Sequence, residues 1–220
     1  MRGQREHPMG GQPVPIVGSD RIDEVIACIR AGGVAGIPTD TVYGLAALPD
    51  HPGALAALAD LKGRDRDQPV AALLDTPEGA TRFLDDPAAL ERVRRFWPGA
   101  LTAVVRARPG GLLPPVATAA GTVGLRVPDD DLARAVIRAC GGILAVSSAN
   151  THGAPPCLDA HEVAEAFPGL LVLDGGRREG GVASTVVNLA SDPPRILRAG
   201  PISASDLGID SEGTTGEPAR

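Results

Sequence analysis

Short apolar segments alternate with amphipathic helical segments along most of the chain, and this alternation restricts the fold more than any other feature. Strands that alternate with short helices indicate one α/β (α+β) domain built on a central sheet. The order of the strands within that sheet does not follow from the sequence. Strands are predicted at residues 34–37, 70–74, 101–105, 123–127, 143–146, 170–173, 185–189 and 195–197. Helices are predicted at residues 22–29, 55–61, 87–96, 130–139 and 159–167.

Both ends of the chain differ in composition from the segment between them. Residues 1–18 are rich in Gly, Pro and Gln, which predicts a flexible arm. Residues 208–220 have almost no apolar side chains, which predicts a disordered tail and leaves residues 19–207 as the folded domain. The N-terminus has no apolar run of signal-peptide length, and the longest uncharged stretch is broken by glycines, prolines and an asparagine. These features predict a soluble cytoplasmic protein that does not enter a membrane.

The cysteines and the basic residues exclude several classes of protein. Cys28, Cys140 and Cys157 are an odd number with no CxxC spacing, so neither a disulfide scaffold nor a cysteine zinc site is expected. The formal net charge is −6, whereas nonspecific nucleic-acid binding requires a basic face. Of the 21 basic residues only Lys62 is a lysine. It is either a product of biased composition or a sign that one site needs a compact ammonium charge.

Five polar segments follow or open predicted strands, where ligands bind in open α/β sheets. Each also has a simpler explanation, because threonine and aspartate are common in turns and charged loops are usually solvated. The motifs GxxxxGK[ST], GxGxxG and GxSxG are absent, which argues against the standard nucleotide and serine-hydrolase sites. The segments are residues 38–45 (PTDTVYGL), 61–70 (LKGRDRDQPV), 122–128 (TVGLRVP), 147–153 (SSANTHG), and 184–188 (STVVN) with 196–201 (ILRAGP).

Two of these segments carry charges that call for a partner. Lys62 and Arg64 are two residues apart, so in extended backbone both side chains point to one face, as binding of a triphosphate requires. The alternative is a solvated turn. Arg126 lies inside an apolar strand, where an isolated charge is costly, and it therefore needs an anionic partner. That partner is either a ligand carboxylate or a carboxylate of the protein.

Taken in this order, the segments resemble the YrdC-type threonylcarbamoyl-AMP synthase family over residues 19–207. The matching pieces are PTDTVYGL, KGR with a following proline, FWPGALT (96–102), TVGLRVP, SSAN-x-x-G, STVV and LRAG. The resemblance implies a single domain with a twisted mixed sheet flanked by helices and a large concave cleft. It also implies a nucleotidyltransferase that forms threonylcarbamoyl-AMP and pyrophosphate from L-threonine, bicarbonate and ATP, with Mg²⁺ accompanying ATP. A partner transferase would then modify an adenosine next to the tRNA anticodon.

The resemblance assigns roles to ten residues of this sequence. Lys62 and Arg64 would be catalytic, since they would offset charge on the leaving pyrophosphate. No side chain is implied as a metal ligand. The implied ATP-binding residues are Lys62, Arg64, Gln68, Thr122, Asn150 and Arg198, and the implied L-threonine-binding residues are Thr41, Arg126, Ser148 and Ser184. Ser148 also matches the family's phosphate-binding set.

The chain departs from the family pattern at four positions, which affects the details of both pockets and not the reaction. The family usually has Lys, Asn or Ser at Gln68, a histidine near Leu73, a hydroxyl residue near Leu158 and an aspartate at Asn188. The chain also has no counterpart of the additional C-terminal domain that longer members carry.

Other functions fit the sequence less well. An RNA-binding module acting in translation or ribosome assembly would need a basic surface with exposed aromatic residues, but this chain is acidic and has five aromatic residues. A weak direct contact with RNA is left open. A carbamoyltransferase that contains the same domain would be a longer chain with cysteine-pair zinc motifs. This sequence has no CxxC pair, so that function is less favoured. A structural or interaction protein without catalytic activity would leave the five polar segments unexplained.

Overall fold

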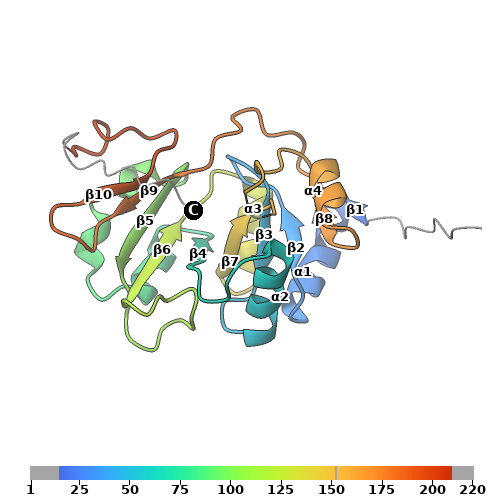
Figure 1. Cartoon of the computed structure of the whole chain (residues 1–220), viewed down its shortest axis with the longest axis horizontal. Helices are drawn as coiled ribbons and strands as arrows, with labels where there is room; N and C mark the ends of the chain where they lie inside the picture. Colours follow the sequence, from blue (N-terminus) through green and yellow to red (C-terminus); the bar gives the residue numbers. More distant parts are fainter. Residues whose placement is uncertain (1–14, 152, 210–220) are drawn as a thin grey trace, which may run out of the picture.

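A computed structural model describes residues 15–151 and 153–209. Within these residues ten strands form one mixed, twisted sheet in the order β1-β8-β2-β3-β7-β4-β6-β5-β9-β10 (Figure 1). The strands are β1 (Ile16–Val17), β2 (Ala35–Ile37), β3 (Gly44–Ala47), β4 (Ala71–Leu74), β5 (Leu101–Arg106), β6 (Thr122–Arg126), β7 (Ile143–Ser148), β8 (Leu171–Leu173), β9 (Thr185–Asn188) and β10 (Arg195–Arg198). The sheet agrees with the expected α/β architecture.

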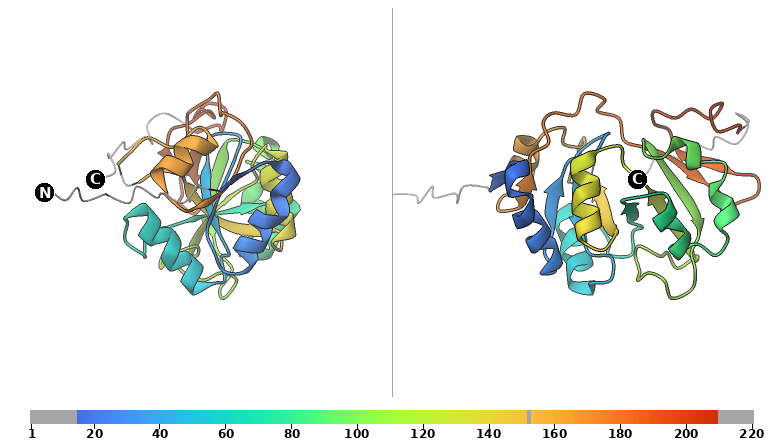
Figure 2. Two further views of the ribbon diagram at one scale, coloured as in Figure 1. Left: turned by 90° about the vertical axis from the view of Figure 1, so that its right-hand side faces the viewer. Right: turned by 180° about the vertical axis from the view of Figure 1, so that it is seen from behind.

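Four α-helices cover the half of the sheet that contains β2, β3, β7 and β8, two on each face (Figure 2). They are α1 (Ile22–Arg30), α2 (Pro52–Lys62), α3 (Asp131–Ala139) and α4 (Ala160–Ala166). Successive side chains of β3 point to opposite faces of the sheet and so join different helix layers. Leu45 packs with the buried residues of α2 and α4, whereas Ala46 packs with those of α1 and α3. Among the described helices, none is long and apolar enough to cross a membrane.

The other half of the sheet has one buried face and one face that lines a cavity. On β5 and β6, Ala103, Val105, Val123 and Leu125 point into the hydrophobic core. The residues between them line the cavity instead. This period of two follows from the geometry of a strand, and it turns one face of the sheet into the floor of a site.

The strand β3 corrects the sequence analysis, which predicted no strand between residues 37 and 70. Residues 38–43 are irregular, and Gly44–Ala47 pairs antiparallel with both β2 and β7. Its sequence GLAA has no β-branched or aromatic residue, so local propensity gives no sign of a strand. Its two neighbours in the sheet determine its conformation.

The helix predicted at residues 87–96 is also corrected, because it is replaced by two short 3₁₀ turns, η3 (Pro87–Leu90) and η4 (Arg94–Phe96). A third 3₁₀ helix, η2 (Glu78–Phe83), precedes them, and η1 (Ser19–Arg21) leads into α1. Leu90 and Val93 are buried, and this spacing of three matches the three residues per turn of a 3₁₀ helix.

At the N-terminus, the structure corrects the last part of the arm that was expected over residues 1–18. Ile16 and Val17 form β1, which pairs with β8, and Val17 is 1% exposed. Two apolar residues are enough for this because β8 offers a free parallel edge. The rest of the predicted arm, residues 1–14, and residues 210–220 of the predicted tail lie outside the described residues.

Candidate functional site

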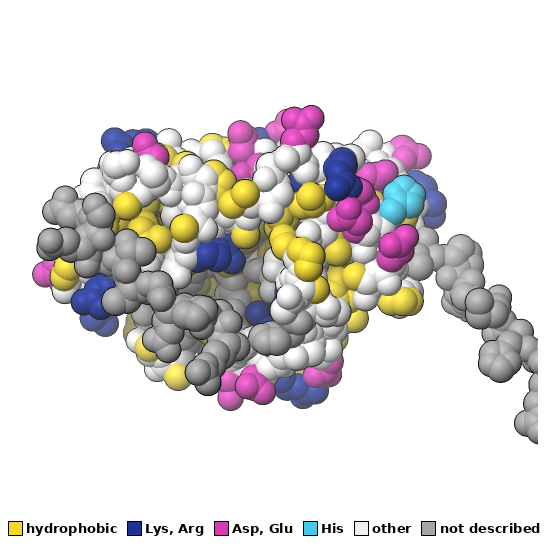
Figure 3. Space-filling model, turned by 45° about the horizontal axis from the view of Figure 1, so that its top comes forward, with side chains coloured by type: hydrophobic (Ala, Val, Ile, Leu, Met, Phe, Trp, Pro, Cys, Tyr) yellow, Lys and Arg dark blue, Asp and Glu magenta, His cyan; other side chains and the backbone are white. Residues whose placement is uncertain are grey.

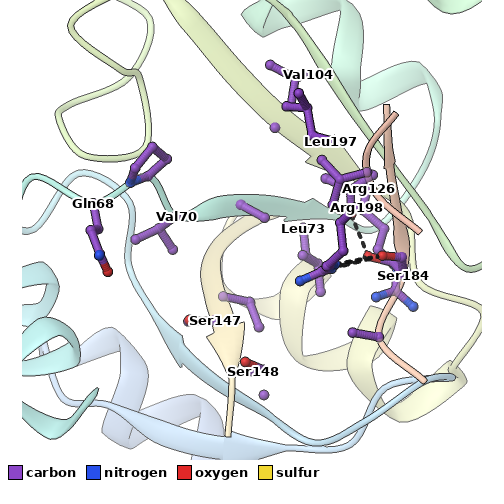
Figure 4. A pocket seen from close by; sticks show the side chains of 18 of the residues that line it. Gln68, Val70, Leu73, Val104, Arg126, Ser147, Ser148, Ser184, Leu197 and Arg198 are labelled. Carbon is purple, nitrogen blue, oxygen red and sulfur yellow. Dashed lines mark hydrogen bonds between the residues drawn. The ribbon is translucent and has the colours of Figure 1, made fainter. Parts of the chain in front are cut away.

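A cavity of about 770 Å³ lies over the middle strands of the sheet, and all ten residues singled out from the sequence line it. Seven strands contribute to its lining, namely β3 to β7, β9 and β10. Its volume is within the range of small-molecule sites in proteins. Figure 3 shows basic side chains inside a hollow near the middle of one face, and Figure 4 shows the lining from close by.

The charge of the cavity is opposite to that of the chain. Lys62, Arg64, Arg126 and Arg198 line it, and no aspartate or glutamate is among the described residues that do so. An acidic protein therefore gathers four cations in one place. Such an arrangement is unfavourable unless anions enter it, so the cavity is suited to a ligand with several negative charges.

Lys62 is the last residue of α2, and its position follows from the way that helix ends. Gly63 adopts the left-handed conformation (φ 60°) and terminates the helix, as glycine commonly does. The Lys62 ammonium is buried and donates to Ser148 O at 2.6 Å, Ser148 Oγ at 3.3 Å and Asn150 Oδ1 at 2.6 Å. Burial, and secondly the charge of Arg64, lower the pKa of Lys62 to about 8. Lys62 therefore ties the end of α2 to the end of β7.

Arg64 differs from Lys62 because part of its guanidinium group has no partner. Its Nε and Nη2 atoms are buried and make no hydrogen bond within the described residues. Buried polar atoms are nearly always hydrogen-bonded, and an unpaired guanidinium is costly to keep. Burial also lowers the pKa of Arg64. The two nitrogens are thus the clearest local sign that this part of the cavity suits an anionic ligand.

Asn150 lines the cavity, but its side-chain amide is already engaged. Its Oδ1 accepts from Lys62 and from Ser148 Oγ at 2.6 Å each. Its Nδ2 donates to Thr151 O at 3.1 Å and Ala154 O at 2.8 Å. In this arrangement Asn150 positions Lys62 and Ser148, and its direct contact with a nucleotide stays a prediction.

Arg126 has a protein carboxylate as a partner, which is one of the two alternatives left open by the sequence. Its Nη2 lies 2.6 Å from Asp40 Oδ1, and both side chains are mostly buried. Its Nη1 donates to Thr41 Oγ1 at 3.1 Å and its Nε to Gly99 O at 3.0 Å. Burial lowers the pKa of Arg126, and Asp40 opposes that shift. The guanidinium group is held on three sides and still borders the cavity.

Hydroxyl groups that line the cavity pair with one another. Ser184 Oγ lies 2.8 Å from Thr102 Oγ1 and accepts from Arg198 Nη2 at 3.1 Å, while Arg198 also donates to Ser184 O (Figure 4). Thr122 Oγ1 lies 2.7 Å from Thr118 Oγ1. Thr102 and Ser184 are buried, so one end of the cavity presents hydroxyls next to the Arg126 and Arg198 guanidinium groups.

Gln68 is the last of the predicted site residues, and it is also one of the four positions that depart from the family pattern. Gln68 is exposed and lies on the opposite side of the cavity from Arg198 and Ser184 (Figure 4). Leu73 and Asn188 line the cavity, whereas Leu158 is not among its lining residues. Within the described residues, no group of three or more His, Cys, Asp or Glu side chains could hold a metal ion.

Sequence reasoning missed Asp40, Thr102 and Thr118, which hold the predicted residues in place. Asp40 carried a usable signal, since a carboxylate between two threonines after a strand is uncommon in a plain turn. Thr102 carried none, because its partner Ser184 lies 82 residues later and is found only when strand order is known. Thr118 pairs with Thr122, four residues later, and a threonine pair at that spacing gives no sign of a site by itself.

Comparisons with known proteins agree on one family. The Sua5/YciO/YrdC family model, described as "Telomere recombination", matches residues 27–200. A Mycobacterium tuberculosis relative is 41% identical over 199 residues, which cover 86% of this chain and 90% of that protein. The Bacillus subtilis threonylcarbamoyl-AMP synthase is 37% identical over 193 residues, which cover 85% of this chain and 55% of that longer protein.

Solved structures support the same assignment. Pyrococcus abyssi Sua5 complexed with L-threonine superposes with a TM-score of 0.81 at 30% identity, and the match covers 88% of this chain and 59% of that one. Escherichia coli YciO superposes with a TM-score of 0.76 over 88% of this chain and 96% of that one. At 22% identity the second structure supports the fold alone.

Proposed function

The chain belongs to the Sua5/YciO/YrdC family, and we propose that it is a threonylcarbamoyl-AMP synthase, a nucleotidyltransferase that uses L-threonine. The observation that carries this proposal is the cavity itself, in which Lys62 and the unpaired nitrogens of Arg64 border one end and buried hydroxyls border the other. The first end suits the phosphates of ATP and the second suits a hydroxylated amino acid.

In the proposed reaction bicarbonate releases CO2, the neutral threonine amine adds to the carbon of CO2, and the amine proton combines with the released hydroxide to form water. The resulting carbamate oxygen then attacks the α-phosphorus of ATP. The bond to the β-phosphate oxygen breaks and pyrophosphate leaves. Lys62 and Arg64 stabilise the negative charge that develops on it. No side chain has to act as a covalent nucleophile, because positioning and charge stabilisation carry most phosphoryl transfers. Mg²⁺ enters with ATP as part of that substrate.

The other proposed contacts rest on the family resemblance, and all the residues concerned line the cavity. Arg126 faces the threonine carboxylate, with Thr41, Ser148 and Ser184 around the amino acid. The list of proposed nucleotide contacts is Lys62, Arg64, Gln68, Thr122, Asn150 and Arg198. The product would be consumed by a separate transferase acting on tRNA next to the anticodon, which would place the reaction in the cytoplasm.

The proposal is tested by incubating the protein with MgATP, bicarbonate and L-threonine and measuring pyrophosphate together with threonylcarbamoyl-AMP. Both products should form only when all three substrates are present. Pyrophosphate release that does not depend on threonine would overturn the proposal. RNA binding without ATP turnover would instead favour the RNA-binding alternative.

Substrate choice gives a first prediction. Thr41 and Ser184 are each 3% exposed and line the cavity, so their hydroxyls offer a threonine hydroxyl a polar environment that is shielded from water. Valine has the shape of threonine without its hydroxyl. We expect kcat/KM for valine to be at least about tenfold lower than for threonine, measured by pyrophosphate release. Equal kcat/KM values for the two amino acids would contradict the assignment of these two hydroxyls to the threonine-binding site.

The lowered pKa of Lys62 gives a second prediction. Below pH 8 the ammonium form predominates and attracts the phosphates, whereas above pH 8 the free protein loses this charge. The Kd for ATP should therefore rise between pH 7.5 and 9.5, by at most about tenfold per pH unit. Titration calorimetry measures it without the pH effects on threonine and bicarbonate. In Lys62→Arg the charge persists and the rise should be absent, so a rise of equal size there would contradict the prediction.

A further inference from the structure

The connection between β8 and β9, residues 174–184, crosses the whole site and is called the strap below. In the sheet order β8 and β9 are separated by seven strand-to-strand steps, and the strap arches over the sheet from one half to the other (Figures 1 and 2). In a flat sheet they would lie roughly 34 Å apart, and eleven residues reach at most about 40 Å. The strap has limited spare length, so its attachment points influence where it delivers its last residue, Ser184.

Arg178 attaches the strap to the half of the sheet that carries β3. Its Nη1 donates to Asp130 Oδ2 at 2.8 Å and to Thr39 O at 3.2 Å, and its Nη2 donates to Gly175 O. Its guanidinium carbon lies 5.8 Å from the centre of the Tyr43 ring. The side chains of Arg178 and Asp130 are 14% and 12% exposed, so this ion pair is far less solvated than a surface pair.

The contacts of Arg178 lead to both walls of the hydroxyl end of the cavity. On one side, Thr39 Oγ1 lies 3.1 Å from Thr41 Oγ1, and Thr41 in turn accepts from Arg126. On the other side, the strap continues from Arg178 to Ser184, whose hydroxyl contacts Thr102. Thr41 and Ser184 are far apart in sequence, and Arg178 contacts one segment while belonging to the other.

Between Arg178 and Ser184, the described strap residues form no other mostly buried ion pair. In the described structure, residues 179–183 make no side-chain hydrogen bond or ion pair, and two of them are glycines. Gly181 has a φ of 59°, and Val182 is 50% exposed. The segment is therefore weakly held. Its starting point is set by the contacts of Arg178 and by the Tyr43 hydroxyl, which donates to Gly176 O and accepts from Gly175 N.

We propose that Arg178 is a positioning residue that sets the separation of the Thr41 and Ser184 walls and thereby selects threonine. The proposal rests on the proposed function. Arg178 does not border the cavity, so it acts through Thr39 and through the strap. Loss of its fork would loosen the Thr39 segment and the strap together, although the Arg178 N–Leu158 O hydrogen bond would remain. Small displacements of positioning groups have large effects on substrate alignment.

The test compares Arg178→Met with Arg177→Met, a matched control on the same strap. Arg177 makes only exposed ion pairs, to Asp159 and Glu162. In Arg178→Met we expect the KM for threonine to rise, and the threonine-to-valine ratio of kcat/KM to fall, by at least about tenfold. The KM for ATP should stay within about twofold, and Arg177→Met should match the unchanged protein in all three.

Because Arg178→Met also unpairs Asp130, thermal unfolding of each variant is measured alongside, and Arg178→Lys provides a second variant. Lysine can keep the charge opposite Asp130 but not the several directed contacts of the fork, so part of the loss in selectivity should persist. A fall in kcat with an unchanged threonine-to-valine ratio in either folded variant would overturn the inference. Absence of threonine-dependent product in the unchanged protein would instead overturn the proposed function.

Discussion

Replacing Lys62 with alanine is expected to lower the rate of threonylcarbamoyl-AMP formation at least about 100-fold, which corresponds to roughly 2.7 kcal/mol or more. The ammonium supplies charge to the phosphate end of the cavity. It also joins α2 to β7 through three hydrogen bonds to Ser148 and Asn150. Alanine removes both, so the rate is lost through missing charge and through misplacement of the β7 end. Steady-state pyrophosphate release measures the effect.

Two further variants separate these causes. Lys62→Arg keeps a positive charge, but a planar guanidinium does not reproduce the three directions in which the ammonium donates, so only partial activity should return. Arg66→Ala is the matched control on the same loop, because Arg66 makes only an exposed ion pair with Asp60. It should change the rate by no more than about twofold. Near-normal turnover of Lys62→Ala would remove the phosphate-site assignment.

The composition of the chain allows this assignment to be tested without mutation. Lys62 is its only lysine, so an amine-directed acylating reagent can modify only that side chain and the terminal amine. Saturating MgATP should slow the labelling of Lys62, and the terminal amine serves as the internal reference. Mass spectrometry of the two peptides gives both rates from one sample. Equal labelling of Lys62 with and without ATP would show that the phosphates bind elsewhere.

The sequence predicted those parts of the fold for which local pattern and tertiary packing agree. The helix at 130–139 is an example, since Asp130 caps α3 by accepting from Ala133 N and the apolar face of the helix is buried. The strand β3 shows the opposite case, because its residues have no strand propensity and are held by β2 and β7. Sequence patterns can identify an element but not a conformation imposed by its neighbours.

The site shows a similar division. The five polar segments could be recognised from the sequence, and their resemblance to one family brought the ten residues together before any geometry was known. The partners of those residues could not be predicted, because pairing depends on strand order. Ser184 meets Thr102 only because β9 lies beside β5, and Lys62 meets Ser148 only because α2 ends near the last residue of β7. The sequence therefore identified the candidate site residues more readily than the residues that hold them in position.

Arg126 has two roles, because it is a proposed threonine-binding residue and also the partner of the mostly buried Asp40. Removing it should therefore have two large effects. Arg126→Met leaves the Asp40 carboxylate mostly buried and without its partner. We expect the free energy of unfolding to fall by about 3 kcal/mol, because an uncompensated buried charge remains. Loss of the fork that we propose binds the threonine carboxylate should weaken threonine binding about 100-fold. Urea denaturation and calorimetry measure the two effects.

The double variant Arg126→Met with Asp40→Asn distinguishes them. Neutralising Asp40 removes the buried charge, so at least half of the lost stability should return, whereas threonine binding should stay weak because the guanidinium is still missing. Asp40→Asn alone should bind threonine better than either variant that lacks Arg126. If the double variant regains threonine binding together with its stability, Arg126 acts only by holding the fold, and the carboxylate of threonine must be bound by another cation of the cavity, with Arg198 the nearest alternative by its contact with Ser184.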